Sequence, residues 1–269
     1  MLSSGESTLA QALAALRQQT LELSSLHQVE GVRPFARAFN QGVSLLEEPY
    51  FVQCDADMIL DDRAVEVLYS GMATGVGMVS ALLDDPLQGA IKGVKLHRTE
   101  LARRFPHREQ ASPETDYRAR WQAEGWREVF LARAGPLGRH LPPEDGPAVA
   151  GRFRYLGAVI RRRGDLSDAR LRLARLAERA EHPRAPLAAL ALLSGLDREE
   201  NQDGCGSTDP RAWQCWQELQ LEDEARAALQ AQDWTHLQLL AQRFRGSAQG
   251  EATRWPAPHP GNRPPSPLE

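Results

Sequence analysis

Residues 49–60 read Pro-Tyr-Phe-Val-Gln-Cys-Asp-Ala-Asp-Met-Ile-Leu and place two carboxylates, Asp55 and Asp57, directly after a short apolar run. An apolar, β-prone run such as Tyr50 to Val52 is typical of a buried strand in a parallel sheet. Ligands of open α/β sheets bind beyond the carboxyl ends of the strands. Burying two like charges together is costly unless a cation joins them, and hard divalent cations take carboxylate oxygens. The stretch therefore predicts a metal site at a strand end.

Composition limits the size of the core and the kind of partner. The chain has 269 residues with 42% hydrophobic content, which is enough for one large domain or two smaller ones. The net charge is −4 and charged residues make up 25%. Neither nucleic acid nor an anionic membrane is therefore expected as the main partner.

Cysteine usage and hydropathy favour a cytoplasmic protein. Cys54, Cys205 and Cys215 form neither a disulfide framework nor a zinc spacing, which fits a reducing compartment. The longest apolar run, Ala185 to Leu196, has about twelve residues, whereas a membrane span needs about 20. The N-terminus lacks the pattern of a signal peptide. We expect a cytoplasmic protein with no transmembrane segment, and peripheral contact with the inner face of a membrane stays open.

Short strand and helix patterns alternate over the first part of the chain. Alternation of this kind predicts an α/β fold with a mixed, mostly parallel sheet and helices on both faces. The strands are expected at residues 1–4, 24–29, 50–52, 76–83, 91–97 and 126–132, and the helices at 9–21, 34–46, 63–73 and from 113 onward.

The C-terminal part of the chain is predicted to be helical. Residues 135–147 are rich in Gly and Pro and are expected to form a loop. Helices are expected at 148–163, 166–196 and 211–244, with a polar break at 201–210. Pro, Gly and Ser dominate from residue 246, so this tail is expected to be disordered. The predicted regions are thus 1–147 (α/β), 148–245 (helical) and 246–269 (tail).

Four segments, in order, carry a resemblance to a known family. They are Gly5-Glu-Ser-Thr-Leu9, Ala36-Arg-Ala-Phe-Asn-Gln-Gly42, Gln53-Cys-Asp-Ala-Asp-Met58, and Pro113-Glu-Thr-Asp-Tyr-Arg-Ala-Arg120 followed by Gly125-Trp126. In this order and spacing the sequence resembles the family 2 glycosyltransferases of the GT-A fold. The resemblance covers roughly residues 5–130. It implies a GT-A-like domain that transfers a sugar, with inversion, from a nucleotide-diphosphate sugar to a glycan, a lipid-linked saccharide or a small acceptor.

The resemblance also implies a metal centre. Asp57 would contact Mg²⁺ or Mn²⁺, and Asp55 would face the donor ribose or the same metal. His140, in Gly138-Arg-His-Leu-Pro, stands where some members place a histidine that completes the metal site. Imidazole can ligate these metals, although Mg²⁺ prefers oxygen.

The remaining site residues are implied by the same resemblance. Alignment on Gly125 puts Glu114 at the position of the catalytic base, with Asp116 two residues later. Both acids lie near a helix N-terminus, whose dipole favours the ionised form that acts as a base. Asn40 and Gly42 correspond to the family's Asn-x-Gly helix and would help to shape the donor pocket.

Each of these residues also has an ordinary structural interpretation. Asp55 and Asp57 are common turn residues, and an acid such as Glu114 suits the first turn of a helix. His140 fits a surface loop equally well, and Gly42 fits the end of a helix.

Two departures from the family pattern leave other functions open. The first strand is very short, and Pro113-Glu114 stands where the family has a pair of acids. A non-catalytic GT-A-like interaction module is therefore one alternative. A phosphatase of the haloacid dehalogenase type is another, but no lysine follows Lys95 to supply its late-placed cation.

Overall fold

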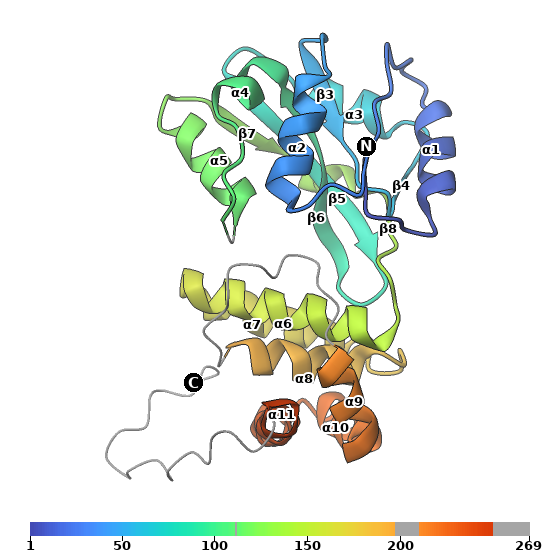
Figure 1. The fold of residues 1–269 in the computed structure, drawn as a ribbon, viewed down its shortest axis with the longest axis vertical. Helices are drawn as coiled ribbons and strands as arrows, with labels where there is room; N and C mark the ends of the chain where they lie inside the picture. Colours follow the sequence, from blue (N-terminus) through green and yellow to red (C-terminus); the bar gives the residue numbers. More distant parts are fainter. Residues whose placement is uncertain (111, 197–209, 250–269) are drawn as a thin grey trace. The chain divides into compact units, whose positions relative to one another are not determined.

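The computed structural model describes residues 1–269 except 111, 197–209 and 250–269. The chain divides into two compact units between Pro142 and Pro143, whereas the sequence placed this boundary after residue 147. The first unit contains β1 (Leu2–Ser3), α1 (Leu9–Arg17), β2 (Val29–Glu30), α2 (Phe35–Ser44), β3 (Tyr50–Gln53), β4 (Met58–Leu60), α3 (Ala64–Ser70), β5 (Val76–Asp85), β6 (Gly89–Arg98), α4 (Thr99–Arg104), α5 (Pro113–Gln122), β7 (Arg127–Phe130), the 3₁₀ turn η1 (Ala132–Ala134) and β8 (Pro136–His140) (Figure 1).

The main sheet is mixed, and the expectation of mostly parallel strands was wrong. Its order is β3-β6-β5-β8-β4, with β7 also paired to β5. The pairs β3–β6, β5–β6 and β4–β8 are antiparallel, and only β5–β7 and β5–β8 are parallel. The cause is a tight hairpin: Asp85 at the end of β5 pairs directly with Gly89 at the start of β6. A connection this short can join only antiparallel strands.

Helices cover both faces of this sheet. Leu16 of α1 and Leu68 of α3 pack with Val79 and Leu96 on one face. On the other face, Met78 packs against α4 and α5. Successive side chains of a strand point to opposite faces, so Met78 and Val79 belong to different cores. The alternation of the sequence thus leads to the layered arrangement that it predicted.

Strand β3 is half-buried, where the sequence predicted a fully buried strand. One edge of β3 pairs with β6, and Tyr50, Phe51 and Val52 all keep partial exposure. β1 is so short that Leu2 bridges to Asp55, beyond the end of β3. Within the described residues no strand lies along the rest of that edge, and a largely apolar cavity of about 330 Å³ borders it.

The segment predicted as a loop at 135–147 contains strand β8, so that prediction was also wrong. Pro136 begins the strand, a position where a missing N–H is tolerated. Gly138 has a φ of +148°, and a Cβ built there would lie 2.3 Å from the carbonyl oxygen of Ile59. Only glycine allows β8 to lie this close to β4, and the Gly and Pro that suggested a loop are what the strand requires.

The second unit is helical, as predicted. It consists of α6 (Gly146–Arg163), α7 (Leu166–Ala177), α8 (Ala185–Leu196), α9 (Pro210–Leu219), α10 (Glu222–Gln230) and α11 (Trp234–Gln249). The region predicted to be helical at 166–196 contains two helices. The region at 211–244 falls within three, which are separated at the left-handed residues Gln220 and Gln232. Helix α11 ends at Gln249, so the segment predicted as a disordered tail from residue 246 begins as helix. The rest of the predicted tail lies outside the described residues. Most of the predicted polar break at 201–210 lies outside them as well. None of the described helices is long and apolar enough to cross a membrane.

Candidate active site

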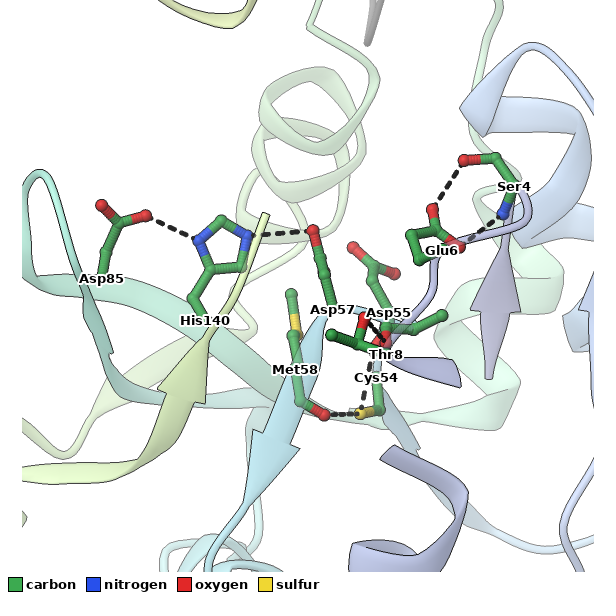
Figure 2. Close-up of polar contacts among 10 residues, drawn as sticks. Ser4, Glu6, Thr8, Cys54, Asp55, Asp57, Met58, Asp85 and His140 are labelled. Atoms are coloured by element: carbon green, nitrogen blue, oxygen red, sulfur yellow. Dashed lines mark hydrogen bonds and ion pairs between the residues drawn. The ribbon is translucent and has the colours of Figure 1, made fainter. Parts of the chain in front are cut away.

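Asp55 and Asp57 lie on a turn that the first strand and the first helix hold in place. The Leu2 N–H donates to the carbonyl of Cys54 (3.0 Å), and the Ala56 N–H donates to the carbonyl of Leu2 (2.8 Å). The Thr8 hydroxyl donates to the Ala56 carbonyl at 2.8 Å, between the two acids. Figure 2 shows the acids rising from this turn between β3 and β4. Short as it is, β1 therefore fixes the turn that carries both carboxylates.

Both acids keep a buried oxygen without a hydrogen-bond partner, Oδ1 in each case. The pKa of Asp55 is raised to about 6, mainly by burial and in part by the nearby Asp57, while Lys95 opposes the rise. Buried polar atoms are rarely left without partners in native proteins, because desolvation is costly. A divalent cation would satisfy both oxygens, so the donor set fits Mg²⁺ or Mn²⁺.

His140 lies beside Asp57. It is the last residue of β8 and pairs in register with Met58 of β4. Its Nε2 lies 3.4 Å from Asp57 Oδ2, and its Nδ1 lies 2.8 Å from Asp85 Oδ2. The imidazole thus stands between two carboxylates, as Figure 2 shows. Asp85 was not found from the sequence, where Asp85-Pro86 has only the character of a turn.

The protein alone offers few ligands. No group of three or more His, Cys, Asp or Glu side chains in the described part of the chain is arranged to hold a metal ion. Mg²⁺ is usually bound by one or two carboxylates together with substrate phosphates and water. The arrangement around Asp55 and Asp57 therefore suits a cation that is shared with a phosphate-bearing ligand.

Glu114 forms an ion pair with Lys95. The Lys95 Nζ lies 2.7 Å from Glu114 Oε1, and the side chains are 14% and 41% exposed. Burial alone would raise the pKa of Glu114, but the Lys95 ammonium outweighs it and holds that pKa at about 2. The same ammonium acts on Asp55. Lys95 was not singled out from the sequence, although Lys92 and Lys95 are its only lysines.

A β-bulge places both lysines of β6 on the same face of the sheet. Lys95 pairs with Ser80 but Lys92 pairs with Leu82, so β6 holds one extra residue between them. Residues three apart in a regular strand point to opposite faces, and a bulge removes that difference. Lys92 consequently reaches Glu128, which also accepts from Ser80 (2.6 Å).

The other predicted residues have partners away from the two acids of the turn. Asp116 is held by Arg120 at 2.8 Å and Arg108 at 3.5 Å. The Asn40 amide donates to the carbonyl of His107 and accepts from its N–H, both at 2.8 Å. Gly42 packs toward Val29 and Leu2. Asn40 and Gly42 thus join α2 to its neighbours, and their role in a donor pocket stays a prediction.

No protein-family model matches the chain, and no curated protein matches it. Among solved structures, it is similar to the mannosyltransferase PcManGT from Pyrobaculum calidifontis in complex with GDP-Man and Mn²⁺. The TM-score is 0.49 and the identity is 15%, over 94% of this chain and 87% of that one.

Proposed function

We propose that the protein is a metal-dependent glycosyltransferase that uses a nucleotide-diphosphate sugar as donor. One observation carries the proposal: two acids at a strand end keep buried, unpartnered oxygens next to His140. The order of motifs that resembles family 2 glycosyltransferases supports the same conclusion. The acceptor would be a glycan, a lipid-linked saccharide or a small hydroxyl compound, attacked with inversion.

Asp57, Asp55 and His140 would hold the cation. A bound divalent cation neutralises the negative charge that develops on a leaving diphosphate. The chain contributes a rigid support: β1, β3 and β8 fix the backbone positions of the three residues. In the described part of the chain these side chains do not form a complete metal site by themselves, so phosphate oxygens of the donor would supply the remaining ligands.

Glu114 would act as the base toward the acceptor hydroxyl. It is ionised at neutral pH, as a base must be, but its low pKa makes it a weak proton acceptor while Lys95 is bound. We propose that Lys95 leaves Glu114 when donor phosphate arrives, because a lysine ammonium binds phosphate well. Glu114 would then become more basic at the moment when the acceptor is deprotonated.

The decisive experiment substitutes Asp57. We expect Asp57→Asn to weaken Mn²⁺ binding, measured by calorimetry, and to lower donor hydrolysis or transfer with a panel of UDP-, GDP- and dTDP-sugars. The loss should exceed the roughly 10–100-fold that outer-shell substitutions cost at metal sites. The matched control is Asp62→Asn, an exposed acid shortly after the turn.

Three outcomes separate the alternatives. Full activity of Asp57→Asn would refute the metal role. Absence of binding of the wild type to any of these nucleotide sugars in the presence of Mn²⁺ would instead support the non-catalytic module. Release of phosphate from p-nitrophenyl phosphate, abolished by Asp55→Asn, would support the phosphatase.

A further inference from the structure

Asp85 has the most constrained carboxylate near the site. Its side chain is fully buried, at the end of β5. Oδ1 accepts from the N–H groups of Leu87 (2.9 Å) and Gln88 (2.8 Å), which fixes the carboxylate within the hairpin. Oδ2 then faces Nδ1 of His140 at 2.8 Å. The orientation of this carboxylate is therefore set by the backbone and does not depend on the histidine.

We propose that Asp85 is a positioning residue that keeps a proton on Nδ1 of His140. An ionised carboxylate can only accept hydrogen bonds, so the close contact at Oδ2 requires Nδ1 to carry the hydrogen. Nε2 is then the nitrogen directed at Asp57, 3.4 Å away. Histidines that ligate metals donate their other N–H to a carboxylate or carbonyl in the same way. The metal part of this inference rests on the proposed function, and the position of the proton does not.

The geometry also predicts what an amide would do at this position. In Asp85→Asn, the two N–H groups of Leu87 and Gln88 keep the amide oxygen at the position of Oδ1. The amide NH₂ then faces Nδ1 of His140 and donates to it. Nδ1 must accept, so the proton moves to Nε2 and points at Asp57. A ring in that tautomer has no lone pair at Nε2 with which to bind a cation.

The proton can be located directly. Long-range ¹H–¹⁵N correlation spectra of the full chain labelled with ¹⁵N-histidine, metal-free at pH 8.5, distinguish protonated from unprotonated ring nitrogens, and His140→Gln assigns the signals. We expect Nδ1 to be protonated in the wild type and in Asp84→Asn, an exposed acid one residue away. We expect the proton on Nε2 alone in Asp85→Asn. A wild-type neutral ring with its proton on Nε2, or an unchanged tautomer in Asp85→Asn, would overturn the proposal.

Mn²⁺ titration by calorimetry, with a nucleoside diphosphate present to complete the ligand set, separates the position of the proton from the role of His140 as a ligand. We expect Asp85→Asn to bind Mn²⁺ about 10–100-fold more weakly than the wild type, with Asp84→Asn unchanged. If Asp85→Asn had the reversed tautomer but bound Mn²⁺ as tightly as the wild type, His140 would not be a metal ligand. A wild type that binds no Mn²⁺ would refute the proposed function, and the spectra would still decide the role of Asp85.

Discussion

At the scale of single residues, one ammonium group acts on the pKa values of two carboxylates. Lys95 pairs with Glu114 and lowers the pKa of that acid to about 2, despite the burial that acts in the opposite direction. Burial dominates at Asp55 and raises its pKa to about 6. Titratable groups whose environments separate their pKa values are typical of catalytic sites. Lys95 is thus the residue through which the two ends of the site are electrostatically coupled.

Substitution of Lys95 tests this coupling. We expect Lys95→Met to raise the pKa of Glu114 from about 2, because the ammonium that holds it low is removed. NMR titration of ¹³C-labelled glutamate carboxyls measures the change. Lys92→Met, which removes the neighbouring lysine and its contact with Glu128, is the matched control. The same pKa of Glu114 in the wild type and in Lys95→Met would contradict the electrostatic coupling between Lys95 and Glu114.

The sequence identified the acids and the histidine of the candidate site but not the residues that hold them. Asp55, Asp57 and His140 belong to motifs with a recognisable spacing, and the structure brings Asp57 and His140 together. Asp85 acts through a hairpin whose antiparallel pairing the sequence did not reveal, and Lys95 depends on a bulge. Both effects come from strand register, which one sequence does not specify.

At the scale of elements, β8 connects the fold to the site. It lies between β5 and β4 and ends at His140. The helices and most strands were predicted because their apolar residues recur with a clear period. β8 was missed because Pro136 and Gly138 favour turns locally, and only its two neighbouring strands stabilise it. A strand of this kind is decided by tertiary packing and not by propensity.

Gly138 offers a test of this packing. We expect Gly138→Ala to destabilise the first unit by about 2–4 kcal/mol, because its Cβ would meet the Ile59 backbone and its φ is positive. Gly135→Ala is the control: its φ is also positive, +72°, but no atom lies within 4 Å of its Cβ. The control should lose only the conformational term, about 1–2 kcal/mol. Equal losses in urea unfolding would show that β8 and β4 are not held this tightly.

At the scale of the whole molecule, the residues of the predicted chemistry belong to the first unit. Asp55, Asp57, Glu114 and His140 precede the division at Pro142, and the helices of the second unit follow it. The division into an α/β part and a helical part could be predicted because the hydrophobic period changes along the chain. The hydrophobic content of the sequence does not show which ionisable groups are buried in the core. Two of these buried groups are the histidines His97 and His107.

His97 and His107 make the first unit sensitive to acid. Both are buried among aromatic rings, and His107 stacks on Phe39 with ring centroids 3.8 Å apart. Burial, with a contribution from Lys95, lowers the pKa of His97 to about 3 and that of His107 to about 4. Both histidines are thus neutral in the folded state. Their unfolded pKa is 6.5, so their stabilising contribution is complete above pH 6.5 and is lost as the pH falls toward 4.

Between pH 6 and 5, above the range in which the glutamates titrate, the slope of stability against pH is set mainly by three groups. In this range each histidine costs about 1.4 kcal/mol per pH unit. Asp55 acts in the opposite sense, because its pKa is raised to about 6 and the folded state binds its proton first. Two losses and one gain leave a net fall of about 1.4 kcal/mol per pH unit.

We expect His107→Phe to remove one loss and make the stability of the first unit nearly independent of pH in this range. Both ring nitrogens of His107 lack hydrogen-bond partners, so the phenyl ring replaces the imidazole at little cost. Urea unfolding at pH 5.0, 5.3, 5.6 and 6.0 measures the slope. The control is His236→Gln, at a half-exposed histidine, and it should keep the slope of the wild type. If stability in His107→Phe fell as steeply with pH as in the wild type, His107 would be excluded as a source of the acid sensitivity.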